Sequence, residues 1–166
     1  MVELEKIDID EGARLGSMWL NAPYGVETLR LLGNIVPDDF KTSYEEEVKR
    51  LTEIASDTNT LGWAIKYNNA TVGVALVKLK EFEGLRAPNI TLFIGDIAMR
   101  GKGVGTAALG LVSEEIKSNY STAYARALTR NIASTAMLQK VGFIADGVPY
   151  TDKDGLHWQN YKNNMK

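Results

Sequence analysis

The sequence predicts a single α/β domain, of the α+β kind, in which one mixed sheet carries helices on both faces. Two patterns support this prediction. Segments with apolar residues at helical spacing and segments in which apolar and polar residues alternate recur along the whole chain. The 166 residues are 45% hydrophobic and 24% charged, which suits one globular domain with a substantial core. We therefore expect residues 1–166 to form one domain without a linker or an internal repeat.

The first part of the chain predicts a strand followed by helices. Residues 2–9 alternate in hydrophobicity and predict the strand. Asp10 is the expected cap of the helix that follows, and a shorter amphipathic segment covers 27–36. Ser43 and Glu46 form a capping box, so a third helix is expected to begin at this point.

The second part of the chain predicts strands and helices in alternation. Two alternating segments within 61–79 flank Asn68-Asn69 and predict a hairpin. The elements expected after it are a strand at 88–95, a helix at 104–118, a strand at 122–128, a helix at 131–140, and two closing strands around Phe143 and Trp158.

A glycine-rich turn joins the strand at 88–95 to the helix at 104–118. From Asp96 it reads Asp-Ile-Ala-Met-Arg-Gly-Lys-Gly-Val-Gly-Thr. The first turn of a helix has backbone N–H groups without intrahelical partners, and the helix dipole adds partial positive charge there. Arg100 and Lys102 add full charges, and the three glycines let a ligand approach the backbone. The turn therefore predicts a binding site for a phosphorylated ligand.

Two common phosphate-binding motifs do not fit this turn. A Walker A loop has four residues between its first glycine and its Gly-Lys pair, whereas five separate Gly95 from Gly101. Gly103 also occupies the place of the Ser or Thr that such a loop requires. A dinucleotide fingerprint fits locally but needs an acidic residue about twenty positions later, and none stands there. A nucleotide-binding regulator is therefore the weaker interpretation.

Two blocks of the sequence resemble the GNAT superfamily of N-acetyltransferases. Arg100-x-x-Gly103-x-Gly105 matches the family's Arg/Gln-x-x-Gly-x-Gly/Ala signature, and residues 131–143 resemble its Asn-x-x-Ser…Leu-x-Lys-x-Gly-Phe block. The run Ile-Gly-Asp at 94–96 is similar to the branch that includes the ribosomal-protein N-terminal (alanine) acetyltransferases. The resemblance implies a splayed, mostly antiparallel sheet of about seven strands with acetyl-CoA bound where two neighbouring strands diverge.

The resemblance also implies which residues contact coenzyme A. Family members bind its pyrophosphate at this turn, and further contacts come from the helix at 131–140. The implied cofactor-binding residues are Ile97, Ala98, Met99, Arg100, Gly101, Lys102, Gly103, Val104, Gly105, Thr106, Asn131 and Lys140. The backbone N–H groups around Ile97 and Ala98 are the implied donors to the thioester carbonyl.

The departing thiolate needs a proton donor, and here the sequence departs from the family pattern. Many members have a tyrosine where this chain has Leu138. Ser134 lies one helical turn earlier on the same face and is a candidate donor, directly or through water. Two alternatives stay open. Ser134 could instead bond to a carbonyl of its own helix, and Asp96 could either relay a proton from the amine or cap the turn.

The function that these features favour is transfer of an acetyl group from acetyl-CoA to a primary amine. The acceptor could be a protein N-terminus, a polyamine or another small molecule. The missing tyrosine leaves a second hypothesis open, a module that binds acyl-CoA without turnover.

Composition sets further bounds on function. The chain has no cysteine, which excludes disulfides, thiolate metal sites and cysteine nucleophiles, and no metal site is expected. The first residues do not form a signal peptide, and no apolar run approaches the ~18 residues of a membrane span. A cytoplasmic protein without membrane contact is therefore expected, and a homodimer is left open.

The charges are unevenly distributed around a net charge of −2. Residues 1–57 contain thirteen acidic and six basic residues, whereas the segment 97–145 is mainly basic. The acidic part could attract a cationic acceptor or could simply cover solvent-facing helices. The basic residues are too sparse and too seldom interleaved with aromatic residues to predict nucleic-acid binding.

Overall fold

The computed structural model describes residues 1–165. Its elements are, in order, β1 (Val2–Glu5), α1 (Ile9–Asn21), α2 (Gly25–Leu31), α3 (Tyr44–Ser56), β2 (Thr60–Tyr67), β3 (Ala70–Lys78), β4 (Asn89–Ile94), the short 3₁₀ helix η1 (Ile97–Met99), α4 (Val104–Ile116), β5 (Thr122–Leu128), α5 (Ile132–Val141), β6 (Ile144–Ala145), β7 (Tyr150–Thr151) and β8 (His157–Asn164).

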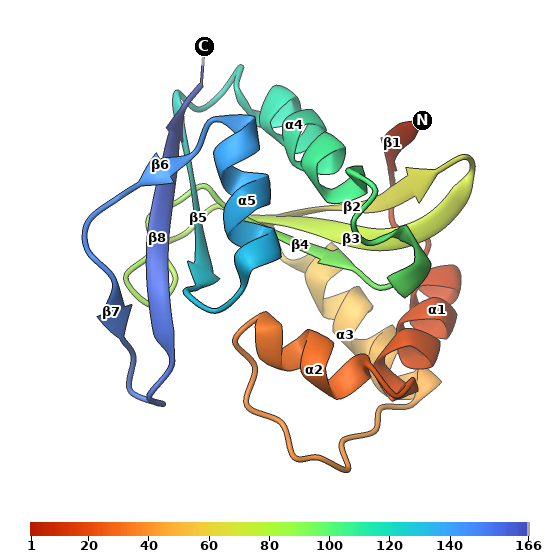
Figure 1. The fold of residues 1–166 in the computed structure, drawn as a ribbon. Helices are drawn as coiled ribbons and strands as arrows, with labels where there is room; N and C mark the ends of the chain where they lie inside the picture. Colours follow the sequence, from red (N-terminus) through yellow and green to blue (C-terminus); the bar gives the residue numbers. More distant parts are fainter. Residues whose placement is uncertain (166) are drawn as a thin grey trace.

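The described strands form one open sheet of eight strands. Their order is β1-β2-β3-β4-β5-β8-β6, and β7 pairs with β8 (Figure 1). Neighbouring strands are antiparallel except for β4 and β5. The mixed, mostly antiparallel sheet predicted from the sequence is therefore confirmed.

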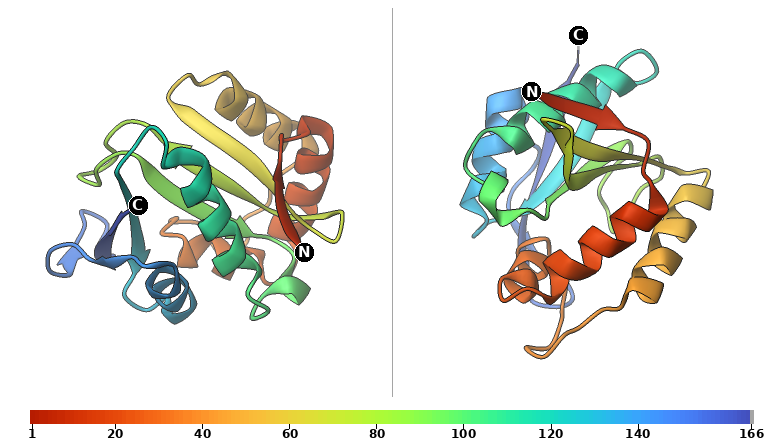
Figure 2. Two further views of the ribbon diagram at one scale, coloured as in Figure 1. Left: turned by 90° about the horizontal axis from the view of Figure 1, so that it is seen from above. Right: turned by 90° about the vertical axis from the view of Figure 1, so that its right-hand side faces the viewer.

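Helices cover both faces of this sheet, as predicted. Figure 2 shows α4 and α5 on one side and α1, α2 and α3 on the other. The core lies mainly under α4 and α5, where Ala108, Val112 and Phe143 are nearly inaccessible to solvent. The helices α1, α3 and α4 have 13 residues each. No helix in the described part of the chain is long and apolar enough to cross a membrane.

The sheet opens between β4 and β5. These two parallel strands pair at Asn89 and Tyr124 near their N-terminal ends, and no further register pair is found between them in the described chain. On its other side β4 is fully paired with β3, from Lys78↔Asn89 to Gly73↔Ile94. Beyond Asn89 the edge of β4 that faces β5 therefore has no strand partner, which confirms the splayed sheet.

A β-bulge in β3 fixes the start of the glycine-rich turn. The register between β2 and β3 shifts between Ile65 and Lys66, which leaves Val72 without an opposite residue. The carbonyl oxygen of Val72 accepts hydrogen bonds from the amides of Gly95 (2.9 Å) and Asp96 (3.2 Å). The chain that leaves β4 is thus held against β3 before it enters the turn.

Several predicted boundaries are wrong, each for a local reason. Asp8, not Asp10, caps α1 by accepting from the amide of Glu11, so β1 ends earlier than residue 9. The second helix ends at Leu31 rather than 36, because Gly33 adopts a φ of 92° and packs under the ring of Trp158. Three strands, not two, close the sheet, because the two-residue strands β6 and β7 both pair with β8, which gives eight strands rather than about seven.

The close approach of β3 and β4 should be sensitive to one methyl group. A Cβ at Gly73 would collide with the carbonyl oxygen of Phe93, so Gly73→Ala should lower the free energy of unfolding by about 1–3 kcal/mol. Gly110→Ala is the matched control, since nothing lies within 4 Å of its added Cβ in the middle of α4. That change should raise the free energy of unfolding by up to about 1 kcal/mol. Urea denaturation compares the three proteins, and a Gly73→Ala variant as stable as the wild type would contradict the argument.

Candidate active site

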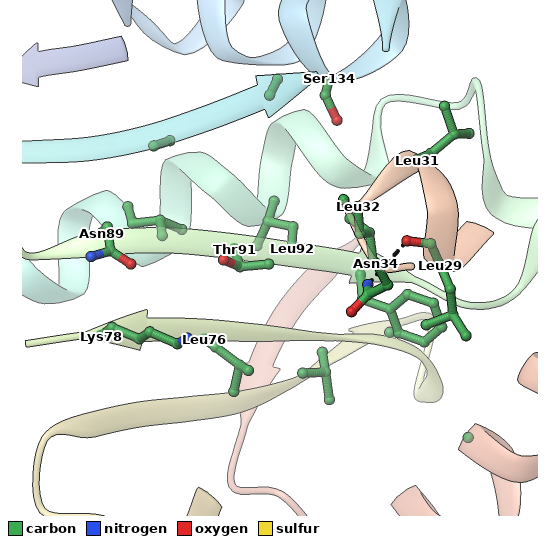
Figure 3. A pocket seen from close by; sticks show the side chains of 18 of the residues that line it. Leu29, Leu31, Leu32, Asn34, Leu76, Lys78, Asn89, Thr91, Leu92 and Ser134 are labelled. Atoms are coloured by element: carbon green, nitrogen blue, oxygen red, sulfur yellow. Dashed lines mark hydrogen bonds between the residues drawn. The ribbon is translucent and has the colours of Figure 1, made fainter. Parts of the chain in front are cut away.

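A cavity of about 570 Å³ runs from the gap between β4 and β5 across the open face of the sheet. One set of lining residues faces the gap: Leu92, Ala125, Ala127, Asn131, Ser134 and Met137. A second set faces the cleft between the sheet and α2: Leu29, Leu32, Asn34, Leu76, Lys78 and Thr91. Figure 3 shows Ser134 reaching from α5 toward β4 above Leu92, with Asn34 and the α2 leucines at one end. The cavity therefore joins the parted strands to the cleft.

The N-terminus of α4 is built to expose backbone N–H groups. Its N-cap, Gly103, has a φ of 79° and supplies no side-chain cap, whereas Asp8, Ser43 and Asn131 cap α1, α3 and α5. The first intrahelical bond runs from the Ala107 amide to the Gly103 carbonyl. The three amides before Ala107, those of Val104, Gly105 and Thr106, are therefore free of intrahelical partners. They provide three donors and the positive end of the helix dipole for an anion.

The glycines of the turn have two different roles. Gly101 and Gly103 adopt φ values of 73° and 79°, and no atom lies within 4 Å of a Cβ added at either. They give the turn its left-handed backbone and leave its outer surface open. Gly105 instead lets α4 approach α5, since its Cβ would lie 3.0 Å from the Met137 sulfur.

Arg100 points into the protein rather than out toward the open surface of the turn. Its guanidinium Nε and Nη2 donate to the carbonyl oxygen of Ile94 (3.1 and 2.8 Å), and Nη2 also donates to Thr28 Oγ1 (3.0 Å). The group lies over the ring of Tyr24, and burial lowers the pKa of Arg100 below its usual value. Arg100 therefore ties the turn to the end of β4 and to α2, while Lys102 is exposed beside the free amides.

Asp96 caps the 3₁₀ helix that opens the turn. Its carboxylate accepts a hydrogen bond from the amide of Ala98 (3.0 Å). The sequence leaves two roles open for Asp96, proton relay and capping of the turn, and this hydrogen bond shows the capping role. The Ala98 amide, expected to donate to a thioester carbonyl, is engaged by this carboxylate, while the side chains of Ile97 and Ala98 are exposed. Proton relay by Asp96 and cofactor contact by Ile97, Ala98 and Met99 stay predictions.

The start of α5 presents a free hydroxyl to the cavity. Asn131 Oδ1 accepts from the Ser134 amide (3.2 Å), and its Nδ2 donates to the Leu31 carbonyl at the end of α2 (3.2 Å). The Ser134 hydroxyl has no hydrogen-bond partner among the described residues, whereas Ser113 Oγ donates to the Leu109 carbonyl of its own helix. The structure therefore shows no hydrogen bond from the Ser134 hydroxyl to a carbonyl of its own helix.

The other two α5 residues singled out from the sequence are Leu138, which lines the cavity with an apolar side chain, and Lys140, which lies outside it. Leu138 is 3% exposed and packs in the core, where it supplies no donor. Lys140 is exposed on the last turn of α5 and does not line the cavity. Its contact with coenzyme A stays a prediction.

Residues of the cleft were not identified from the sequence. Arg126 on β5 lies with its Cζ 3.9 Å from the ring centroid of Trp158, and Lys78 at the end of β3 lines the same cavity. The alternation of Tyr124, Arg126 and Leu128 predicts that they share a face of the strand. Nothing in the sequence indicates that this face of β5 lies near Lys78 of β3, because their proximity depends on the order of the strands in the sheet.

A splayed sheet followed by a glycine-rich turn and a helix without a side-chain cap is the architecture expected of an acetyltransferase. Residues 4–144 match the family model described as the acetyltransferase (GNAT) domain. The chain belongs to this family. No curated protein matches the sequence.

Solved structures share the fold along nearly the whole chain. The first is RimL, a ribosomal L7/L12 α-N-protein acetyltransferase in complex with coenzyme A, with 17% identity and a TM-score of 0.79 over 99% of this chain and 94% of that chain. A microcin C7 self-immunity acetyltransferase, MccE, in complex with acetyl-CoA and AMP has 17% identity and a TM-score of 0.78 over 99% and 92%. The aminoglycoside acetyltransferase AAC(6′)-Ib in complex with ribostamycin and coenzyme A has 16% identity and a TM-score of 0.77 over 98% and 93%.

The inward position of Arg100 leads to a prediction about stability. Arg100→Met removes the donors to the Ile94 carbonyl and the Thr28 hydroxyl, and should lower the free energy of unfolding by about 1–3 kcal/mol. Lys102→Met removes an exposed charge two residues away and should change it by less than about 0.5 kcal/mol. Urea denaturation measures both variants. If Arg100→Met unfolds at the same urea concentration as the wild type, the guanidinium does not anchor the turn.

Proposed function

We propose that this protein is an acetyl-CoA-dependent N-acetyltransferase that acts on a primary amine by direct attack. The observation that carries the proposal is one continuous cavity, which joins the gap between β4 and β5 to the cleft beneath α2. An extended cofactor and an acceptor entering from the other side would meet inside it. The complexes of RimL, MccE and AAC(6′)-Ib with coenzyme A or acetyl-CoA support the assignment of the cofactor.

The residues present fit coenzyme A at two points. Its pyrophosphate would accept hydrogen bonds from the free amides of Val104, Gly105 and Thr106, with Lys102 beside them. The pantetheine arm carries amide groups, and the unpaired edge of β4 offers backbone donors and acceptors to an extended chain. Both features use the backbone, so they would hold coenzyme A without depending on particular side chains.

The reaction requires a neutral amine, stabilisation of the oxyanion and a proton for the departing thiolate. In the proposed reaction the amine nitrogen attacks the thioester carbonyl carbon, and backbone N–H groups at the gap stabilise the oxyanion. When the carbon–sulfur bond breaks, Ser134 donates a hydrogen bond to the thiolate and relays a proton from water. The proton lost by the amine passes to water in the open cleft. The products are the acetylated amine and free coenzyme A.

A non-catalytic acyl-CoA-binding module is the second candidate function. Its support is the buried Leu138 at the position where many family members have a tyrosine. Release of thiol from acetyl-CoA in the presence of amines separates the two functions. Because the chain has no cysteine, a thiol reagent reports only free coenzyme A.

Coenzyme A should raise the melting temperature of the wild type, and Gly103→Glu should abolish this shift. A carboxylate at the N-cap would occupy the free amides and repel the pyrophosphate. Gly147→Glu is the matched control, because Gly147 has a similar φ of 82° and open surroundings but lies far along the chain, between β6 and β7. Thermal-shift titration measures all three proteins. A folded Gly103→Glu variant that binds coenzyme A as tightly as the control would refute the role of the turn.

Ser134→Ala should lower turnover by about 10²-fold, the low end for a positioned acid, since water can partly replace the hydroxyl. Affinity for coenzyme A should change little. Ser113→Ala is the control, because it removes a hydroxyl that bonds within α4 and should cost only about 1 kcal/mol of stability. Turnover and melting temperature are measured on the same preparations. Unchanged turnover in Ser134→Ala would assign the proton donor to an ordered water or another residue.

A further inference from the structure

Two cationic side chains lie on the floor of the cleft. Lys78 is in register with Asn89, and Asn89 with Tyr124, so the three residues share one face of the sheet. Arg126 is two residues beyond Tyr124 on β5 and points to the same face. Figure 3 shows Lys78 extended along this floor beside Leu76. Both cations line the cavity.

One aromatic ring lies against both cations. The Lys78 Nζ atom is 3.6 Å from the ring centroid of Phe82, and the Arg126 Cζ atom is 5.5 Å from it. Arg126 is also stacked on Trp158, and its side chain is 13% exposed. The aromatic rings hold the two cations in place and remove part of their water.

Two carboxylates that line the cavity, Glu47 and Glu11, are already paired within the protein. Glu47 binds Arg50 and the hydroxyl of Thr42, and Glu11 lies 3.7 Å from Lys66 and accepts from the hydroxyl of Thr71. These internal pairs balance the charges of Glu47 and Glu11. The expectation that the acidic N-terminal part attracts a cationic acceptor therefore loses its support at these two residues.

The cations are less well compensated. Glu83 accepts one hydrogen bond from Arg126 Nη2 (2.8 Å) at the rim, and Asp152 is occupied by three donors, among them Trp158 Nε1. No carboxylate among the described residues pairs with Lys78, whose pKa is lowered by burial and by the nearby Arg126. No fully buried side-chain nitrogen in the described chain lacks a partner, so any donor of Lys78 or Arg126 without a protein partner is accessible to solvent, and both residues line the cavity.

We propose that the cleft selects acceptors that carry an anionic group beside the amine, a carboxylate or a phosphate, bound by Lys78 and Arg126. The inference rests on the proposed acetyl transfer. An anion at this place supplies the charge partner that Lys78 lacks and accepts hydrogen bonds from the free N–H groups of Arg126. The amine of the same molecule is then left to point along the cavity toward Ser134.

The test compares acceptors that differ only in this charge. Thiol release from acetyl-CoA is followed with β-alanine and γ-aminobutyrate against their amides, and with O-phosphoethanolamine against ethanolamine. We expect kcat/KM to be at least about tenfold higher for the anionic member of one series, and the series that responds identifies carboxylate or phosphate. Lys78→Met keeps roughly the length of the side chain. It should lower kcat/KM about tenfold to a hundredfold for the anionic acceptor only. Lys80→Met, an exposed charge outside the cavity, is the control and should leave the preference unchanged.

A second measurement separates this inference from the proposed function. Binding of the same acceptors is followed by thermal shift with coenzyme A present. Turnover of the neutral amines as fast as the anionic ones, or indifference to Lys78→Met, would overturn the anion site and leave acetyl transfer standing. Binding of an anionic amine that Lys78→Met abolishes, without thiol release, would support the site and refute the transferase. If no anionic member binds better than its neutral counterpart, the inference is wrong.

Discussion

The pairing of Asn89 with Tyr124 is the contact on which the site depends. Here β4 and β5 touch and then part. Asn89 is 3% exposed and its side chain donates to the carbonyls of Lys80 and Arg86, while the Tyr124 amide donates to the Pro88 carbonyl (2.9 Å). These bonds fix the strands at one end, so that the gap widens only toward the glycine-rich turn. A longer parallel ladder would fill the gap with strand hydrogen bonds and leave neither a cavity nor a free edge on β4.

Helix α2 links the two halves of the site. Thr28 accepts from Arg100 of the turn, the Leu31 carbonyl accepts from Asn131 at the start of α5, and Glu27 pairs with Arg130 (2.9 Å). The same helix and the loop after it line the cleft. The wall that would meet an acceptor is therefore bonded to both segments that would meet the cofactor. A displacement of either segment would shift the wall of the cleft, because the bonds from Arg100 to Thr28 and from Asn131 to Leu31 are partly buried.

The sequence predicts features that depend on local chemistry. The Ser43 cap, the Asn68-Asn69 hairpin and the exposed amides after Gly103 each follow from a few neighbouring residues. It does not predict which way Arg100 turns, because its partners Thr28 and Ile94 come from other elements. The meeting of Lys78 with Arg126 also depends on β4 lying between their strands. Residues brought together by strand order have no signature in a single sequence.

The proposed cofactor site is made largely of main-chain atoms, and this has an evolutionary consequence. Amides after Gly103, the carbonyl of Val72 and the open edge of β4 persist under almost any substitution that keeps the backbone path. Gly101 and Gly103 are the constrained positions, since both need positive φ. Lineages can therefore drift far while the architecture endures, as the TM-score of 0.79 at 17% identity with RimL illustrates. The proposed acceptor preference rests on side chains such as Lys78 and is free to diversify within the same scaffold.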